Sequence, residues 1–441
     1  MELRIMKTPR LRNSFIAFAL PFLSGLSLAG PTDSLSIGDA ISLVLSRNPA
    51  LQEAAHMIEA SKARVEQSRG GYSPTADVEA SYTYLAPVAE IEFGGFGFQV
   101  FPASNYDGHI VLRQTVYDFS KTSAQVELAE SRVVLAQDSR ESIGRDLAFR
   151  TAEVFYGILF LRRSVEVQDE QIRTLNEHLS TTQKKISSGT ATQLDALTTQ
   201  VRIAAAQTIK INLENALHRA EISLRKLAAL APEDPLNLKG EFLTRLPPLT
   251  QDSLRTVALN CRIEAKAAAN AVESASAQQR SAQTSERPSV NAVIAYGLKN
   301  GYVPDLDVLR GNFVAGLQLR IPLLDAHRSN SLEQEAQATL NAAEARKRDV
   351  DLGIQAEVQQ AIAEVRAALE KVQVATVSIE RAEKAVENAR LRYEAGTVQN
   401  LDLLDATTER AQAKLNNLQA LYDVVTSGFQ LRRAIGSPPL E

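Results

Sequence analysis

The side chains best suited to do chemistry in this sequence are carboxylates, and two of them, Asp402 and Asp405, stand three residues apart. Positions three apart lie on the same face of a helix, so a helix through this segment would present both carboxylates together. Such a pair is most simply a solvated surface feature. If several copies of the chain placed the pair around one axis, it would instead form an electronegative constriction that attracts cations.

Catalytic and metal-binding chemistry find little support. The five histidines share no metal-ligand spacing, and there is no His-Glu-x-x-His motif, no phosphate-binding loop and no serine nucleophile elbow. The single cysteine, Cys261, allows neither an intrachain disulfide nor a thiolate metal cluster. We therefore expect a protein that is not an enzyme and that carries no cofactor and no metal.

The elements that position the carboxylates must be long, because the chain is poor in residues that form turns. Its 441 residues include 21 glycines and 16 prolines, about 8% of the chain against roughly 12% in average usage. Hydrophobic residues at 44% and charged residues at 23% exclude disorder and a polytopic helical membrane protein. With 48 basic and 52 acidic residues, the net charge of −4 gives no sign of a nucleic-acid surface.

The first 29 residues are typical of a secretory signal peptide. Four basic residues precede an apolar run over 14–28, and cleavage is expected after Ala29. A signal anchor is the alternative, but a 15-residue run interrupted by Pro21 is short for a membrane span. No cysteine follows the cleavage position, so we expect no lipid anchor on an N-terminal cysteine.

The two halves of the chain repeat one another, because a shift of 207 residues superposes identical or similar residues. The clearest match is a short motif in which a Gly-Thr pair is followed, after three intervening residues, by a Leu-Asp pair. Its residues are Gly189, Thr190, Leu194 and Asp195 in the first copy and Gly396, Thr397, Leu401 and Asp402 in the second. Nearer the start the shift becomes 214, which places a seven-residue insertion in the first copy. We predict repeats over 30–231 and 251–437, a linker over 232–250 and a tail over 438–441.

Each repeat carries two strands. Apolar and polar residues alternate over 76–84 and over 290–298, which predicts amphipathic strands near 75–85 and 289–298. A second strand follows in each copy, near 109–118 and 313–324, and the inserted segment between the strands of the first copy, rich in glycine, is predicted to be a loop.

The rest of each repeat is helical. No proline lies between Pro102 and Pro232 or between Pro322 and Pro438, and apolar residues recur every seven positions with alanine between them. This heptad pattern predicts close-packed coiled coils, with long helices over 119–188 and 326–395 and return helices over 191–230 and 398–435. Shorter helices, near 37–67 and 253–283, should lead into the strands.

Four strands with one apolar face cannot close a barrel alone, and open sheet edges are not tolerated in lipid. Three protomers would supply twelve strands, with the polar faces lining the lumen. Aromatic residues are concentrated around the predicted strands, where they would anchor a barrel at the membrane interfaces. Any single one of them could instead be part of a core. They include Tyr82, Tyr84, Tyr117, Phe119, Tyr296 and Phe313.

These features resemble the TolC-like outer-membrane efflux proteins, above all in the motif Gly-Thr-x-x-x-Leu-Asp-x-Leu-Asp-Ala-Thr-Thr that begins at Gly396. The resemblance covers the whole mature chain. It implies a mostly α homotrimer, in which four strands per protomer form a twelve-stranded barrel in the outer membrane, continuous with a helical coiled-coil barrel in the periplasm. It also implies a trimeric exit duct of a tripartite pump, with a periplasmic adaptor and an inner-membrane transporter as partners.

The resemblance assigns roles to the two hairpin tips. The adaptor would dock at Gly189, Thr190, Leu194, Asp195, Gly396, Thr397 and Leu401, and the family's entrance gate matches Asp402 and Asp405. Val398 stands where some relatives carry a basic residue, so a salt-bridge latch from that position is not expected. The cargo is either small molecules such as drugs or, in type I secretion, polypeptides. The alternative from another class is a periplasmic coiled-coil adaptor or structural protein without a pore.

Overall fold

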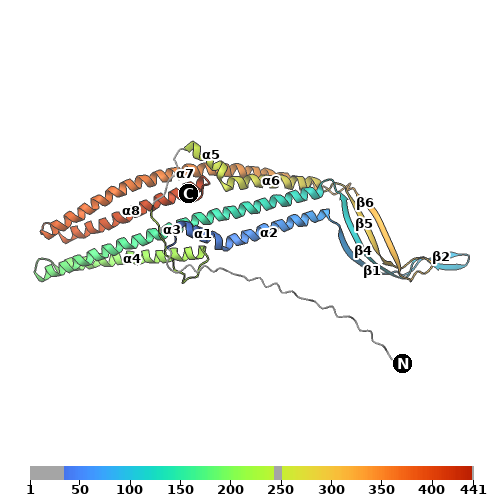
Figure 1. Cartoon of the computed structure of the whole chain (residues 1–441), viewed down its shortest axis with the longest axis horizontal. Helices are drawn as coiled ribbons and strands as arrows, with labels where there is room; N and C mark the ends of the chain where they lie inside the picture. Colours follow the sequence, from blue (N-terminus) through green and yellow to red (C-terminus); the bar gives the residue numbers. More distant parts are fainter. Residues whose placement is uncertain (1–33, 243–250, 440–441) are drawn as a thin grey trace, which may run out of the picture.

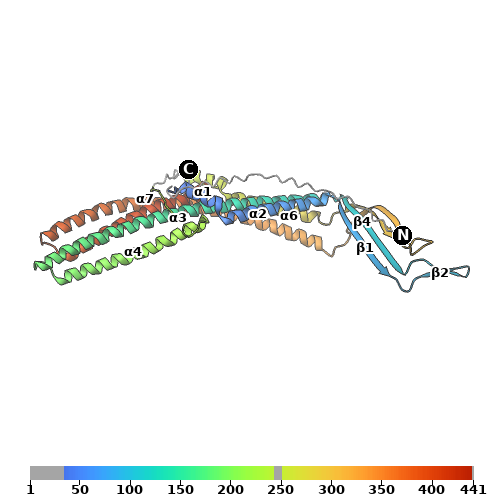
Figure 2. The same ribbon diagram turned by 60° about the horizontal axis from the view of Figure 1, so that its bottom comes forward.

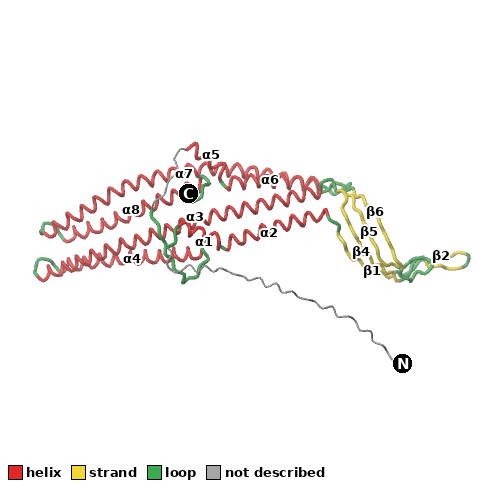
Figure 3. Tube along the Cα trace, in the orientation of Figure 1, coloured by secondary structure: helices red, strands yellow, loops and turns green. Residues whose placement is uncertain are grey.

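The computed structural model describes residues 34–242 and 251–439, and the predicted signal peptide lies outside them. The molecule is elongated, with two helical hairpins at one end and a small sheet at the other (Figure 1). Shorter helices lie beside the long ones between the middle of the molecule and the sheet, and a second view shows the strands tilted away from the line of the helices (Figure 2). Helices thus dominate, and the sheet is confined to one end (Figure 3).

The long helices match their prediction to within a few residues. Helix α3 spans Lys121–Ser187 and helix α7 spans Arg328–Glu394, 67 residues each, or roughly 100 Å at about 1.5 Å per residue. The return helices are α4, Gln193–Leu227, and α8, Asn400–Ala434. Both pairs start and end at positions related by the shift of 207, so the repeat seen in the sequence is a repeat of structure.

The predicted shorter helices are each divided in two. The first pair is α1, Ile37–Arg47, and α2, Pro49–Arg69, separated at Asn48, whose backbone is extended. Pro49 accounts for the break, because proline has no N–H to continue α1 but suits the first turn of α2. The second pair is α5, Gln251–Cys261, and α6, Ile263–Thr284, separated at the extended Arg262.

Four strands form one antiparallel sheet in the order β1-β4-β5-β6. Their bounds are Thr75–Tyr84, Ser104–Tyr117, Ser289–Lys299 and Arg310–Arg320. The strand predicted near 109–118 therefore begins five residues earlier, and the one near 313–324 is shifted to 310–320. Apolar alternation continues through Leu323, but Pro322 offers no N–H to a ladder, and the sheet ends before it.

The glycine-rich insertion forms a hairpin rather than a plain loop. Strand β2, Glu90–Phe93, pairs with β3, Phe96–Gln99, around a turn in which Gly94 and Gly95 both have positive φ. Glycine adopts this backbone without steric cost, so a tight turn forms where the composition suggested only a loop. The hairpin projects beyond the ends of the four main strands (Figure 1).

The strand-to-helix corners are built alike in both repeats. Phe119 and Ser120 in the first, and Ala326 and His327 in the second, have positive φ, the left-handed backbone that side chains usually avoid. An aspartate holds each corner. Asp118 Oδ2 accepts a hydrogen bond from the Thr122 backbone N–H at 2.8 Å, and Asp325 Oδ2 accepts one from the Ser329 N–H at 2.7 Å.

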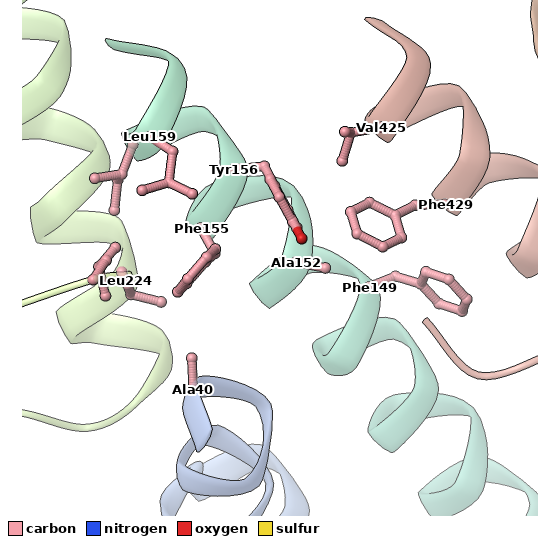
Figure 4. Packing of buried hydrophobic residues seen from close by; sticks show 11 residues of the cluster. Ala40, Phe149, Ala152, Phe155, Tyr156, Leu159, Leu224, Val425 and Phe429 are labelled. Atoms are coloured by element: carbon pink, nitrogen blue, oxygen red, sulfur yellow. The ribbon is translucent and has the colours of Figure 1, made fainter. Parts of the chain in front are cut away.

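A large buried cluster lies at mid-height, where α1, α3, α4 and α8 meet. Phe155 and Ile158 of α3 are fully buried there, as is Val425 of α8, and Leu224 of α4 is 1% exposed. The aromatic rings of Phe155, Tyr156 and Phe429 pack edge-on or tilted, with centroids about 5.5 Å apart (Figure 4). This cluster joins the two repeats where the long hairpins leave the shorter helices.

Within the described residues, no helix combines the length and the apolar character needed to cross a bilayer.

Nearer the tips, the hairpins are joined by an ion pair across α3 and α8. Lys414 Nζ lies 2.8 and 2.7 Å from the two carboxylate oxygens of Glu170, and Arg410 approaches to 3.5 Å. The hydrogen bond from Lys414 lowers the pKa of Glu170, with a further contribution from the charge of Arg410. The internal seam, defined here as the α3–α8 contact within one protomer, therefore contains charge.

We predict that Gly297→Ala disrupts the sheet. A Cβ at Gly297 would lie 1.9 Å from the Gly108 carbonyl oxygen, an overlap that only a shift of the β4–β5 pairing can relieve. The melting temperature of the purified protein should fall clearly, as measured by thermal unfolding. Gly108→Ala is the matched control, since no heavy atom lies within 4 Å of its Cβ position; equal melting temperatures of the two variants would contradict the prediction.

We predict that Glu170→Gln destabilises the protein at neutral pH but not in acid. Because the folded state lowers the pKa of Glu170 from its ordinary 4.5, the stabilisation is present above that value and is lost as pH falls through the lowered pKa. The expected loss at pH 7 is up to about 1 kcal/mol, typical of a partly exposed pair. Thermal unfolding at pH 7 and pH 3 measures it, and a difference that persists at pH 3 would count against the ion pair.

Candidate gate at the hairpin tips

Each hairpin turns at a Gly-Thr pair. Gly189 and Gly396 adopt φ values of +75° and +72°, the left-handed cap that ends a helix. Next to them, the backbone N–H and the hydroxyl of Thr190 both donate to the Lys185 carbonyl, at 2.8 and 3.2 Å. Thr397 repeats this arrangement on Arg392. The glycine and the threonine therefore cap the C-terminal ends of α3 and α7. Their contribution to the backbone structure is enough to explain why these residue types stand at the turns.

The aspartate after each tip begins the return helix. Asp195 Oδ2 accepts from the Thr192 N–H at 2.8 Å and from its hydroxyl at 2.7 Å, which caps α4. Asp402 does the same for α8, accepting from the Gln399 N–H at 2.9 Å. Both aspartates are thus N3 residues of capping boxes, where a carboxylate also complements the helix dipole.

Asp405 binds a partner from the other hairpin. Its Oδ1 lies 2.7 Å from Arg202 Nη2, and the side chains of Arg202 and Asp405 are 37% and 53% exposed. Arg202 belongs to α4 and Asp405 to α8, so the pair joins the two return helices. Asp402 and Asp405, expected to act together, therefore have different contacts: Asp402 caps its own helix, and Asp405 is neutralised by a neighbouring cation.

Further contacts join the tips around Asn400, which is 6% exposed. Its side-chain oxygen lies 2.6 Å from His178 Nε2, and its amide donates to the Asp195 carbonyl at 3.1 Å. Tyr393 packs edge-on against the His178 ring, and Lys185 Nζ lies 4.0 Å above the Tyr393 ring centre, within the range of a cation–π contact. The two tips therefore form one hydrogen-bonded unit rather than two independent turns.

Several leucines are exposed at the tips, among polar residues. Leu194 is 71% exposed and Leu197 51%, while Leu401 is 48% exposed and Leu391 54%. Thr190 and Thr397 are exposed as well. These exposed leucine side chains provide apolar surface that a partner protein could cover.

At the other end of the molecule, the sheet has two chemically distinct faces. On one face Arg113 contacts Asp77 at 3.2 Å and Glu79 at 2.6 Å, and Lys299 contacts Asp107 at 3.3 Å. The opposite face carries apolar side chains that are exposed in the protomer, among them Val78, Ile110, Leu112, Ile294, Leu317 and Leu319.

The predicted interface aromatics are all exposed. Tyr82, Tyr84, Tyr296 and Phe313 range from 59% to 65%, and Tyr117 and Phe119 are 58% and 40% exposed. Tyr82 pairs across the ladder with Tyr106, and Tyr117 packs against Phe119 at the strand-to-helix corner. Their exposure excludes a role in the protomer core.

Sequence patterns did not reveal the cross-hairpin partners. Arg202, His178 and Lys185 contact residues more than 200 positions away, and nothing in their local spacing distinguishes them. Tyr393 was visible only as one position of the heptad. Among the described residues, no group of three His, Cys, Asp or Glu side chains is placed to hold a metal ion.

Comparison with known proteins assigns the family. The sequence model of the family described as Outer membrane efflux protein matches residues 40–230 and, a second time, residues 254–437. Protein CyaE of Bordetella pertussis is 25% identical over 412 residues, which cover 92% of this chain and 84% of CyaE. Outer membrane protein TolC of Escherichia coli is 21% identical over 434 residues, which cover 95% of this chain and 86% of TolC.

The fold is likewise shared with solved structures. The crystal structure of the outer membrane protein VceC of Vibrio cholerae matches with a TM-score of 0.77 at 17% identity, covering 91% of this chain and 96% of VceC. The two matched segments coincide with the two structural repeats, and together they span most of the sequence. The chain belongs to the Outer membrane efflux protein family.

Proposed function

We propose that the protein is the outer-membrane exit duct of an export machine and works as a homotrimer. The observation that carries this proposal is the sheet, which has one apolar face, one charged face and two unpaired edges, and which continues directly into long helical hairpins. An adaptor without a pore would have no use for lipid-facing strands. The strand lengths of 10, 14, 11 and 11 residues suit tilted membrane strands, which need about 9–11 residues.

Three copies of the chain would pair the backbone hydrogen-bonding groups at the two edges of the sheet. Strands β1 and β6 are its edges and run in opposite directions, so β6 of one copy meets β1 of the next as an antiparallel pair. Closure gives twelve strands, an even number within the range of outer-membrane barrels. The charged face then lines the lumen, and the apolar face and its aromatic residues contact lipid.

The tips form the periplasmic entrance in this proposal. Three copies of the Asp402 and Asp405 pair would surround the axis, but Arg202 offsets the charge of each Asp405. The negative potential at the entrance is therefore set mainly by Asp402. The exposed leucines and threonines at the tips would bind a periplasmic adaptor, and the adaptor would link the duct to an inner-membrane transporter.

In this proposal, the adaptor and the transporter supply the energy for export and select the cargo. The duct performs no chemical step in this proposal, and a wide lumen passes drugs or unfolded polypeptides alike, so efflux and secretion share one channel. Purified protein in planar bilayers should give stepwise currents from a stable trimer. A protein that remains monomeric in detergent and carries no current would overturn the proposed function.

For the gate, we predict that Asp402→Asn with Asp405→Asn weakens channel block by multivalent cations. Asparagine removes the charge but can still accept the capping hydrogen bond, so the tips should keep their fold. Single-channel current at increasing trivalent-cation concentration measures the block, and the half-blocking concentration should rise at least tenfold. Asp195→Asn serves as control, because Asp195 has the same capping role in the first repeat. Unchanged block would remove the two aspartates from the gate.

We also predict that Arg202→Gln has the opposite effect. Loss of the guanidinium leaves Asp405 unpaired and adds three carboxylate charges to the entrance, so the half-blocking concentration should fall severalfold. The effect should shrink at high salt, because these groups are exposed to solvent. Arg219→Gln, at an exposed arginine farther along the same helix, should leave block unchanged. Equal block in the Arg202 variant and the wild type would contradict the assignment of Arg202.

A further inference from the structure

The connection between β1 and β4 forms an arm at the end of the sheet that lies away from the helices. The outer arm, defined here as residues 85–103, contains the β2–β3 hairpin and projects beyond the four main strands (Figure 1). In it, the Leu85 N–H donates to the Ala103 carbonyl at 2.8 Å, and the Val100 N–H donates to the Ala89 carbonyl at 3.3 Å. The outer arm is therefore an extension of the β1–β4 ribbon rather than a free loop.

Side-chain hydrogen bonds fix the base of the outer arm to the sheet. Asn300, which follows β5, is 3% exposed; its side-chain oxygen accepts from the Tyr106 N–H at 2.8 Å, and its amide donates to the Ser104 carbonyl at 2.7 Å. The Asn105 amide donates to the carbonyl of Pro102 at 2.9 Å, and Pro102 is buried. The sheet thus holds the hairpin in a definite place.

The β2–β3 hairpin has two unlike faces. Residues paired across an antiparallel ladder share a face, and successive residues along a strand lie on opposite faces. By this register one face carries four apolar positions, which are Ile91, Phe93, Phe96 and Phe98. The other face carries two acidic residues, a glycine and an amide, which are Glu90, Glu92, Gly97 and Gln99. Ile91 is 59% exposed, and Glu92 beside it is exposed as well.

The outer arm begins where a membrane strand would end. Strand β4 has 14 residues, which at about 3.4 Å per residue and a tilt of about 45° extend roughly 34 Å across a hydrocarbon core of about 30 Å. Exposed aromatic residues lie at the outer ends of the strands, among them Tyr82, Tyr84 and Tyr106. The arm leaves β1 directly after Tyr84, so in the proposed duct it starts at the membrane interface.

The charged face of the sheet offers no apolar partner to the hairpin. The register places Asp107, Lys299 and Arg310 in one row across β4, β5 and β6, at the outer end of the charged face. Lys299 contacts Asp107 at 3.3 Å, and Arg310 contacts Asp305 at 2.9 Å. A hairpin folded over the mouth of the duct would bring its apolar positions against these ion pairs. Turned outward, it continues the aromatic belt of the apolar face.

We propose that the outer arm lies in the outer interface of the membrane, with its Ile91 face against the lipid acyl chains and its Glu92 face toward water. This proposal rests on the proposed duct and adds a lipid contact outside the barrel wall in each copy. Amphipathic elements bind this boundary by burying their apolar face about 5–10 Å into it while the polar face stays hydrated. The alternation of apolar and acidic residues in the hairpin matches that requirement.

Fluorescence quenching by lipid tests the proposal, because the sequence contains no tryptophan and a single introduced one is a unique reporter. The full-length protein with Ile91→Trp is reconstituted into phosphatidylcholine vesicles with or without bromine on the acyl chains, since bromine quenches indole on contact. Brominated lipid should remove about half or more of the emission, because the reporter lies at the acyl-chain boundary. Glu92→Trp is the matched control on the opposite face and should keep nearly all of its emission.

A third reporter separates failure of the arm from failure of the duct. Ile294→Trp stands on the apolar face of β5, where Ile294 is 45% exposed and would contact lipid in the proposed barrel. Quenching of Ile294→Trp without quenching of Ile91→Trp would overturn the proposal and leave the duct standing; an arm folded over the mouth or covered by another copy gives that result. Equal quenching of Ile91→Trp and Glu92→Trp would contradict the assignment of the two faces. Absence of quenching at Ile294→Trp would refute the proposed function itself.

Discussion

The constraint on which the rest of the structure depends is that backbone hydrogen-bonding groups cannot be left unpaired in lipid. A four-stranded sheet with edges at β1 and β6 is incomplete as a membrane element. The central β4–β5 ladder joins the two repeats and leaves β1 and β6 as the outer edges. In the proposed trimer these edges would meet those of other copies, and the charged and apolar faces of the sheet would then have distinct environments.

The duplication repeats the same backbone geometry in both halves of the chain, but the side chains of the two repeats differ. Helix ends, corner aspartates and tip glycines recur at the same shift. The charged residues that join the two hairpins do not recur, since Glu170 and Lys414 have Val377 and Gln207 as counterparts and Arg202 has Glu409. The same backbone therefore carries different side-chain contacts in its two copies.

At the tips, the same residues would serve folding and, in the proposed duct, channel function. A carboxylate at the N3 position stabilises the start of a helix, and in the proposed trimer it would also face the axis. Asp402 can combine both roles, because the carboxylate that accepts the capping hydrogen bond from Gln399 also carries the charge that the proposed entrance would use. Asp405 is different, since its charge is offset by Arg202 of the other return helix. Motion of one hairpin against the other would therefore change the electrostatics of the entrance as well as its width.

The sequence by itself determined the repeat, the four long helices and the presence of two strands in each copy, because periodicity and the positions of glycine and proline act locally. It misplaced the last strand by following the alternation past Pro322, and it missed the break at Asn48 and the β2–β3 hairpin. Only the tertiary structure decided which helices lie side by side. Contacts such as Arg202 with Asp405, or Asn400 with His178, join residues more than 200 positions apart. No local pattern in the sequence indicates such a pairing, since it depends on how the core orients the two hairpins relative to each other.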